Sequence, residues 1–481
     1  MIKKAIEKWN TIPLQVKASV AYTVCSILQR CLSFITLPLF TRLLTQEQYG
    51  IHNIYVSWSS IFSIFITLNL AYGSFSTAMV HFEKERNEYI AAIQNICAAL
   101  CGVFLMIYLP FADFWNPLLK LPTPIVCMMA ADVLTGFALL CWYGKQRFEF
   151  KYKSVVLVTL ATSVATPLLS YFLVIGSTQK GYARTIGYAV VGIVVGAYIF
   201  VSNTIKGKGG LNKKFWKYAL SFNIPLIPYY LSQVIFNQSD QLMISHLSGT
   251  DKAAMYGVAF NLATLLNFVL NAINNSYVPW FYGKIKEGKP QENKSVATGI
   301  SLLMAFMLMG VISLAPEIIL IMAGEAYAEA AWVVPPVAMS ILLLFYSQLF
   351  INVEFYYEEK NLLVWGSIGA AVLNVVLNAL LIPVFGFVAA GYTTLISYLV
   401  FAVANYYTMK IAVKKQGGTM DAFSLPALTL LFLGFAALAF TAMALYNLPI
   451  VRYIIVAAVL LSITIMHKKV AAFVTSVLKR G

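Results

Sequence analysis

The chain has 481 residues, of which 60% are hydrophobic and 11% are charged, and its mean hydropathy is +0.76. A soluble protein of this length is excluded, because a surface that faces water needs more charge. The formal net charge of +15 does not require nucleic acid as a partner, since contact with anionic head groups on one side of a membrane accounts for it.

Long apolar segments follow one another from residue 16 almost to the end of the sequence. A membrane-spanning helix needs about 20 apolar residues, and these segments lack the alternating pattern of a membrane-facing strand. The sequence therefore predicts an all-α polytopic membrane protein with about fourteen spans. They lie near 16–40, 52–80, 90–111, 123–143, 154–176, 182–204, 218–247, 254–282, 295–315, 333–355, 363–383, 388–409, 424–446 and 449–466.

The basic residues indicate the orientation, because cytoplasmic loops are enriched in Lys and Arg. With the N-terminus in the cytoplasm, only six of the 34 Lys and Arg residues fall in outer loops, and Arg30 lies within a span. An even number of spans also places the basic tail in the cytoplasm. We expect a multi-pass protein of the inner, cytoplasmic membrane with both termini cytoplasmic and no cleaved leader.

A basic, glycine-containing segment separates the first six predicted spans from the other eight. A weak repeat supports a division there, since turns ending in Tyr49-Gly50 and in Tyr256-Gly257 each open a helix; chance recurrence of Tyr-Gly is the alternative. The two halves would be parallel repeats around a central lumen. The expected parts are an N-terminal six-helix bundle at 1–204, a cytoplasmic linker at 205–217, a C-terminal six-helix bundle at 218–409, and an appended helix pair with a basic tail at 410–481.

Two local features modify this pattern. Pro225 and Pro228 remove two backbone donors within one turn, so we expect the seventh span to be kinked or broken there. The outer segment 316–332 carries acidic residues between apolar ones, which predicts a short helix at the outer interface with Trp332 at head-group depth; a plain loop is the alternative.

Ionisable residues at membrane depth cost roughly 2.5–3.5 kcal/mol on insertion scales, so each one normally faces a cavity or a partner. Arg30, beside Gln29 in the first span, is the sharpest candidate for substrate binding. A guanidinium offers a fork of donors that suits phosphate or diphosphate. The alternative is a structural ion pair with Asp132 or Asp240.

Acidic residues are equally few within the spans. Asp240 in the seventh span is a candidate for gating or ion coupling. Asp132 in the fourth span is a second candidate, and structural pairing between helices is its alternative. We expect Glu354, beside Tyr356 and Tyr357, to lie at the membrane interface.

Amide side chains form a stripe in the eighth span. Such a stripe either bonds a neighbouring helix or lines an aqueous path, and four amides exceed what one helix contact needs. We therefore predict a lumen lining that meets sugar, with Tyr277 nearby as an aromatic contact; the interfacial aromatic belt is the alternative for the tyrosine. The stripe consists of Asn267, Asn271, Asn274 and Asn275.

Motifs for chemistry are absent from the sequence. It has no G-x-x-x-x-G-K-[ST] loop for ATP and no Cys/His pattern for a metal. We therefore expect a transporter rather than an enzyme, with no cofactor, no metal and no nucleic acid.

Several loose motifs occur in a fixed order along nearly the whole chain, and in this order they resemble the Wzx-type polysaccharide flippases of the multidrug/oligosaccharidyl-lipid/polysaccharide (MOP) transporter superfamily. The motifs are residues 30–44 with Tyr49-Gly50, residues 237–244, Pro279-Trp280, residues 316–318, residues 373–378 and residues 391–394.

The resemblance implies that two helical bundles enclose a lumen. It also implies that an undecaprenyl-diphosphate-linked oligosaccharide moves from the cytoplasmic to the outer leaflet by alternating access, for capsule, O-antigen or exopolysaccharide synthesis. Membrane lipids and polysaccharide polymerase machinery would be further partners. Arg30 occupies a position similar to a first-helix arginine that contacts the diphosphate. Because other basic residues within the spans are few, Arg147, Lys151 or Lys217 at the inner mouth would also meet the phosphates.

Three other functions stay open. A cation-coupled multidrug exporter of the same superfamily would use acidic residues such as Asp132 and Asp240, and a lipid II flippase also fits fourteen spans. A membrane glycan ligase or polymerase needs a large outer loop with catalytic residues, and the sequence offers none beyond 316–332.

Overall fold

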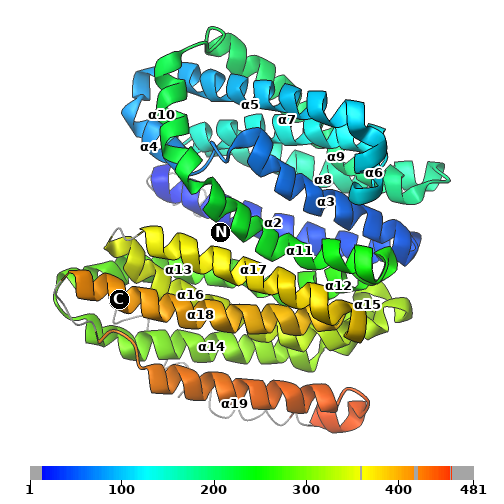
Figure 1. Ribbon diagram of the computed structural model, residues 1–481, viewed down its shortest axis with the longest axis vertical. Coiled ribbons are helices and arrows are strands. Elements are labelled where there is room, and N and C mark those ends of the chain that lie inside the picture. Colours follow the sequence, from blue (N-terminus) through cyan, green and yellow to red (C-terminus); the bar gives the residue numbers. More distant parts are fainter. Residues whose placement is uncertain (1–13, 358–359, 417–420, 455–456, 458–481) are drawn as a thin grey trace, which may run out of the picture. The chain divides into compact units, whose positions relative to one another are not determined.

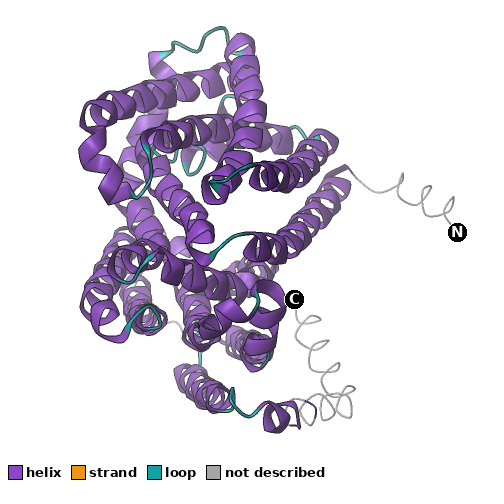
Figure 2. Ribbon diagram, turned by 90° about the vertical axis from the view of Figure 1, so that its right-hand side faces the viewer, coloured by secondary structure: helices purple, strands orange, loops and turns teal. Residues whose placement is uncertain are grey.

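A computed structural model of the chain describes residues 14–357, 360–416, 421–454 and 457. Within these ranges the regular structure is helical, and Figure 2 shows no strand in them. Twelve helical segments there are long and apolar enough to cross a membrane. The predicted all-α polytopic fold is confirmed, while the count of fourteen spans stays a prediction.

Two predicted spans have no counterpart among those twelve. The span near 449–466 lies largely outside the described residues. The span near 52–80 is interrupted after Thr67, because Leu68 and Asn69 adopt left-handed backbone angles with φ of 45° and 54°. The prediction of one continuous helix was wrong there, since apolar length alone does not reveal such a turn.

The chain divides into two compact units, Met1–Ser245 and His246–Gly481; Figure 1 colours the first from blue to green and the second from green to orange. The α-helices described in unit 1 are α2 (Leu14–Leu43), α3 (Gln46–Thr67), α4 (Ser74–His81), α5 (Arg86–Tyr108), α6 (Ala112–Leu119), α7 (Thr123–Phe148), α8 (Tyr152–Gly176), α9 (Lys180–Lys206), α10 (Lys213–Asn223) and α11 (Ile227–Leu247), whose last two residues belong to unit 2.

The α-helices described in unit 2 are α12 (Thr250–Ala263), α13 (Asn267–Lys286), α14 (Asn293–Ser313), α15 (Ala315–Ala323), α16 (Val334–Tyr356), α17 (Lys360–Phe385), α18 (Ala389–Lys415) and α19 (Leu425–Ala444). Short 3-10 helices link several of these elements. They are η1 (Glu83–Glu85), η2 (Leu109–Phe111), η3 (Ile224–Leu226), η4 (Thr264–Leu266), η5 (Pro290–Glu292) and η6 (Glu325–Val333).

The basic segment 205–217 lies inside unit 1. The side chain of Asn95 donates to the carbonyl of Gly209 over 2.5 Å, and the Trp216 indole donates to the carbonyl of Ala92 over 2.9 Å. These bonds fasten the segment to α5, so the boundary between the compact units comes later in the chain. The bundle boundaries expected from the sequence stay a prediction.

Several long helical segments are broken by 3-10 turns, among them α10–α11 and α12–α13. The break between α10 and α11 falls on Pro225 and confirms the prediction for that segment. The break at η4 was not predicted, because no proline marks it. There the Thr264 hydroxyl donates to the carbonyl of Phe260 over 2.7 Å, and side-chain bonding of this kind competes with the helical pattern.

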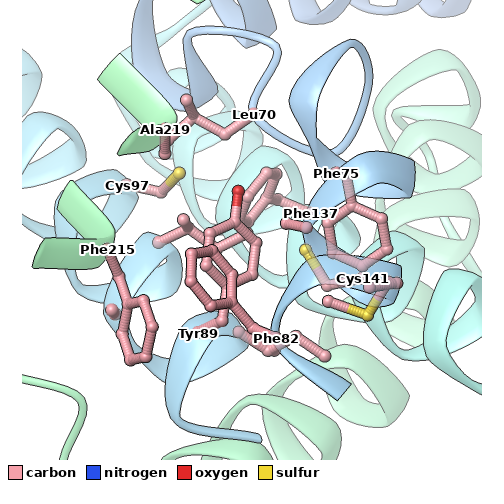
Figure 3. Close-up of a cluster of buried hydrophobic side chains, with 14 residues drawn as sticks. Leu70, Phe75, Phe82, Tyr89, Cys97, Phe137, Cys141, Phe215 and Ala219 are labelled. Carbon is pink, nitrogen blue, oxygen red and sulfur yellow. The ribbon is translucent and has the colours of Figure 1, made fainter. Parts of the chain in front are cut away.

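A buried aromatic cluster joins α4, α5, α7 and α10 of unit 1 (Figure 3). Three of its rings contact one another: that of Phe82 lies 5.7 Å from Tyr89 and 5.0 Å from Phe215, and the Tyr89 and Phe215 rings lie 5.8 Å apart. Such pairs add roughly 0.5–1.5 kcal/mol beyond burial of their area. The cluster therefore holds the short helices α4 and α10 against the long ones.

Small residues let α9 approach its neighbours in unit 1. A Cβ at Gly187 would lie 2.5 Å from the Cα of Ser170 on α8, and a Cβ at Gly196 would lie 2.5 Å from the carbonyl oxygen of Thr135 on α7. Side chains larger than glycine would collide at both places. This close packing fixes α9 beside the carboxylate-bearing helix α7.

Helix α16 is the central element of unit 2. Every residue from 334 to 343 is buried, and the helix packs against α14 and α18. A short helix at 315–323 confirms that element of the 316–332 prediction, while its place at the outer interface stays a prediction. Arg452 pairs with Glu317 of this helix, and the Trp332 ring lies 5.3 Å from that of Tyr446.

Candidate functional site

Helix α3 is long but too polar to count among the apolar spans. Its buried residues include His52, Asn53 and Ser57, and the helix packs against α5, α7 and α9. The polar groups are therefore enclosed by helices of the same unit rather than turned to lipid, which is how intramembrane polar groups are normally kept.

A hydrogen bond joins α3 to the carboxylate of α7. The Tyr55 hydroxyl donates to Asp132 Oδ2 over 2.9 Å. The other carboxylate oxygen lies next to α9, because a Cβ at Gly192 would come within 3.2 Å of Asp132 Oδ1. Tyr55 is fully buried and Asp132 is half-buried. Three helices thus converge on one acidic side chain.

Further polar rings continue from this pair toward α9. The Tyr188 ring lies 6.4 Å from that of Tyr55 and 4.9 Å from that of His52. The Nδ1 atom of His52 is buried and has no hydrogen-bond partner in the described residues. Nearby, the Arg184 guanidinium lies 4.0 Å from the ring centre of Tyr49, at the start of α3. Titratable groups on α3, α7 and α9 therefore form one continuous patch inside unit 1.

Asp132 also lies at the wall of a cavity of about 380 Å³. The cavity is formed by the C-terminal end of α3, the turn that follows it, and α7. Its polar wall consists of Ser63, Thr67, Asn69, Tyr72, Asp132 and Tyr143. Asp132 thus accepts a hydrogen bond from a hydroxyl group and also borders a cavity. This arrangement suits the binding of a proton or a small cation.

Asp240 lies on α11 and is only 2% exposed. Its neighbours Gln238 and Gln241 both accept hydrogen bonds from the Ser57 hydroxyl of α3, over 3.0 and 3.1 Å. The C-terminal end of α11 is held by Lys120, whose ammonium donates to the carbonyl of Ser245. The bonds of Ser57 thus join α11 to α3 close to Asp240, whose role in gating or ion coupling stays a prediction.

The first-span candidates lie on α2. Gln29 Nε2 donates to the Ser163 hydroxyl of α8 over 3.0 Å, so this amide ties two helices together. The backbone of Arg30 continues α2, and its side chain lies outside what the structure describes. The predicted phosphate contact of Arg30 is therefore neither supported nor excluded by geometry.

The amide stripe falls on α13 of unit 2. Asn274 donates to Gln348 Oε1 of α16 over 2.5 Å, and Tyr277 donates to Asn293 Oδ1 over 2.9 Å. Tyr277 is thus packed between helices. The side-chain oxygens of Asn267 and Asn274 are buried without a partner in the described part of the chain. The side chains of Asn271 and Asn275 lie outside the description.

Glu354 is buried, with 1% of it exposed, near the C-terminal end of α16, and its place at the membrane interface stays a prediction. Thr408 of α18 donates to Glu354 Oε1 over 2.6 Å. A Thr hydroxyl at the right height on the facing helix satisfies one carboxylate oxygen, which the position of Glu354 near two tyrosines did not reveal.

The basic candidates at the predicted cytoplasmic side lie near the bend between α7 and α8. Lys151 pairs with Glu149 over 2.6 Å, and Lys145 approaches the same carboxylate at 3.5 Å. Burial would raise the pKa of Glu149, but the two lysines outweigh it and the pKa lies below its ordinary value. The guanidinium of Arg147 lies 5.6 Å from the ring centre of Tyr22 on α2. Lys217 is exposed on α10, and no contact joins it to this group in the described residues.

The sequence reasoning did not identify Tyr55, Ser57 or Glu149. Tyr55 and Ser57 lie within the predicted span 52–80, and an isolated Tyr or Ser in a predicted span is usually a core residue. Plotting 46–67 as a helical wheel and noting its high share of polar residues would have marked this helix as enclosed.

Comparisons with known proteins agree with this fold. A family model described as "Polysaccharide biosynthesis protein" matches residues 16–283. An Lsg locus protein of Haemophilus influenzae is 22% identical over 293 residues, which cover 57% of this chain and 67% of that protein.

Two solved structures share the architecture. A lipid II flippase, MurJ, in an inward closed conformation matches with a TM-score of 0.68 and 13% identity, over 94% of this chain and 100% of that one. An inward-facing multidrug resistance MATE family transporter of the MOP superfamily matches with a TM-score of 0.64 and 14% identity, over 83% of this chain and 100% of that one. These likenesses show the fold.

The family match starts in α2, runs through the polar helix α3 and reaches α13. It therefore includes the carboxylates Asp132 and Asp240. Since it covers more than half of the sequence, this membrane protein belongs to the polysaccharide biosynthesis protein family.

Proposed function

We propose that the protein is a flippase that moves an undecaprenyl-diphosphate-linked oligosaccharide from the cytoplasmic to the outer leaflet of the inner membrane. It would do so by alternating access, with both termini in the cytoplasm, and would supply capsule, O-antigen or exopolysaccharide synthesis and its polymerase machinery. Membership of the polysaccharide biosynthesis family is the observation that carries the proposal. The likeness to flippase and transporter structures supports it at the level of fold.

The phosphates would be met by Arg30 in the first span and by the basic group between α7 and α8. Arg147 supports this role, because it has no carboxylate partner in the described residues and its guanidinium is held only over Tyr22. Lys151 forms an ion pair with Glu149, so its positive charge would attract the phosphates less strongly. A guanidinium forms paired hydrogen bonds to phosphate oxygens, which favours Arg147 over the lysine.

The oligosaccharide would be met by amide groups. Asn267 and Asn274 on α13 each have a side-chain oxygen without a partner in the described residues. Sugar hydroxyls are both donors and acceptors, so such oxygens would be satisfied when a glycan is present.

The Asp132 site would couple transport to an ion gradient. Binding of a proton or a cation removes the cost of a charge at membrane depth, so occupancy of Asp132 changes the free energy of the states that bury it. Tyr55 would follow this change, because its hydroxyl is bonded to the same carboxylate. Asp240, held through Ser57 and its glutamine neighbours, would respond to movement of α3.

A second function is favoured by the same acidic cavity. A cation-coupled multidrug exporter would bind an organic cation at Asp132, and the cavity beside it has a volume of about 380 Å³. Such a substrate needs no phosphate contact. The two functions therefore differ in their dependence on Arg30 and Arg147.

Transport in proteoliposomes tests the proposal. The purified protein is reconstituted with a labelled diphosphate-linked oligosaccharide, and transfer to the opposite leaflet is followed with and without an imposed proton or sodium gradient. We expect transfer that a gradient accelerates and that Asp132→Asn makes independent of the gradient. Uptake of a cationic dye without transfer of any such lipid would assign the protein to the exporters.

A further inference from the structure

A long apolar groove lies on the surface of unit 1, along α8 and beside α2. Its volume is about 720 Å³. Apart from Tyr152 and Lys153 at one end, all the residues that line it are Ala, Val or Leu. They are Ala21, Val156, Leu157, Leu160, Ala161, Val164, Ala165 and Leu168. A water-filled path would carry polar side chains, so this groove suits a hydrocarbon chain.

The hollow arises from the sizes of these side chains. Ala161 and Ala165 are one turn apart on the same face of α8, and both are exposed. Larger side chains stand on either side of them, with Leu157 70% and Leu168 52% exposed. Gln29 ties α2 to α8 through Ser163 and so keeps the second wall in place.

The length of the groove selects among lipids. From Tyr152 to Leu168 it follows α8 for about 24 Å, at 1.5 Å per residue. One leaflet of the hydrocarbon core is about 15 Å thick. A single phospholipid acyl chain that starts at the inner surface would end near the middle of the membrane, so phospholipids could cover the whole groove only with chains from both leaflets. A polyprenyl chain is longer than one leaflet.

Positive charge is gathered at one end of the groove. Lys153 lines that end and is exposed. Arg147 lies over the ring of Tyr22, whose neighbour Ala21 belongs to the wall. The Tyr22 hydroxyl is buried and has no hydrogen-bond partner in the described part of the chain, so its proton is available for donation to a ligand. Two cations and a hydroxyl near the mouth of an apolar groove match a diphosphate joined to a hydrocarbon tail.

We propose that this groove is the resting site of the tail of a polyprenyl diphosphate lipid, with the diphosphate held by Arg147 and Lys153. The inference rests on the proposed function and deepens it, because it places the lipid part of the substrate on α8 of unit 1. The tail stays in the membrane along α8 while the head group is handed to the transport path. One polyprenyl chain can follow the whole groove, which a single phospholipid acyl chain cannot.

Site-specific crosslinking tests the position of the tail. Benzoylphenylalanine replaces Leu157 in the full-length protein, and the control variant carries it at Val194 of α9, which is similarly exposed at 63%. The probe is undecaprenyl diphosphate without glycan. We expect a saturable crosslink at position 157 that excess probe competes away and phosphatidylglycerol does not. Equal crosslinking at both positions, or equal competition by phosphatidylglycerol, would overturn the proposal.

Filling the groove gives a second test. Ala161→Trp and Ala165→Trp place indoles in the hollow, and Val194→Trp is the matched control. We expect each groove variant to weaken binding of undecaprenyl diphosphate at least about tenfold, which equals 1.4 kcal/mol, and the control to bind like the wild type. Arg147→Gln with Lys153→Gln should weaken binding without abolishing the apolar contact. Unchanged binding in both tryptophan variants would show that the tail lies elsewhere.

The two proposals fail in different ways. If the wild type transfers no lipid-linked oligosaccharide but position 157 still crosslinks the probe as expected, the flippase function falls and the lipid site stands. If transfer occurs and neither groove variant changes it, and no specific crosslink forms, the groove proposal falls while the function stands.

Discussion

The Tyr55 hydroxyl donates a hydrogen bond of 2.9 Å to Asp132, and this bond joins the enclosed polar helix α3 to the carboxylate of α7. Two helices of unit 1 thereby share one titratable group. Under the proposed ion coupling, a change in the occupancy of Asp132 would reach α3 through Tyr55, and Gln238 and Gln241 of α11 through the Ser57 hydroxyl. These hydrogen bonds are the path by which the proposed ion binding would change the positions of the helices.

Replacement of Asp132 by Asn tests this path. The variant keeps the size of the side chain and removes the charge, so we expect a folded protein whose transport no longer responds to a proton or sodium gradient. Tyr55→Phe should reduce the response in part, because the carboxylate loses its donor, and should cost about 1–3 kcal/mol of stability. Tyr188→Phe is the control, since the Tyr188 ring lies 6.4 Å from that of Tyr55 and this variant leaves the hydrogen bond from Tyr55 to Asp132 in place. A normal gradient response in Asp132→Asn would make the carboxylate structural.

Arg30 should be essential for transport of a diphosphate lipid. We expect Arg30→Ala to abolish transfer while expression and thermal stability persist, because the guanidinium is assigned to substrate rather than to packing. Arg30→Lys keeps the charge and loses the paired hydrogen bonds, so it should retain a small part of the activity. Full activity of the alanine variant would exclude the phosphate role.

Glu149 should limit the charge that Lys151 offers to phosphate. Glu149→Gln frees this lysine and Lys145, so we expect several-fold tighter binding of undecaprenyl diphosphate at low salt and a smaller gain at high salt. Glu85→Gln, which breaks a similar pair with Lys214, is the control. Equal effects of the two variants would point to general surface charge instead.

The pH dependence of this pair follows from the pKa of Glu149, which the two lysines hold below its ordinary value against the effect of burial. A carboxyl group whose pKa falls on folding adds stability above its unfolded value of about 4.3 and loses it as the pH falls through the lower folded value. Glu149 therefore stays ionised from about pH 5 to pH 8. We expect the gain in affinity of Glu149→Gln over the wild type to be constant in this range, measured by titration at several pH values.

Removal of the Asn274 amide and removal of the Asn267 amide of α13 should have different effects on stability. Asn274→Ala leaves Gln348 without its donor, so we expect a loss of about 1 kcal/mol in stability as well as slower transport. Asn267→Ala removes an oxygen that has no partner in the described residues, so transport should slow with little change in thermal stability. A melting temperature measured beside the transport rate separates the two. Unchanged transport in Asn267→Ala would remove this residue from the glycan path.

Local chemistry in the sequence predicted part of the fold. Pro225 and Pro228 predicted the break between α10 and α11. A proline lacks the backbone N–H donor, and this loss interrupts a helix whatever its tertiary contacts are. The break at Thr264 and the turn after Thr67 depend on a hydroxyl-to-carbonyl bond and on left-handed backbone angles. Neither the hydroxyl bond nor the left-handed turn changes the hydropathy profile of the sequence.

The candidate site was harder to predict than the fold. Asp132 could be found, because a carboxylate stands out in an apolar span. Its donor Tyr55 could not, since helix rotation decides whether a tyrosine meets a carboxylate or lipid. The donor to Glu354 could not be predicted either, because Thr408 lies 54 residues later in the sequence. Contacts between distant segments are the information that one sequence lacks.

Gradient-dependent transfer of a labelled undecaprenyl-diphosphate-linked oligosaccharide in proteoliposomes tests the central claim most directly. The account predicts transfer by the wild type, acceleration by a proton or sodium gradient, loss of transfer in Arg30→Ala and loss of the gradient response in Asp132→Asn. Absence of transfer by a folded wild-type protein, with gradient-driven uptake of a cationic dye, would contradict it.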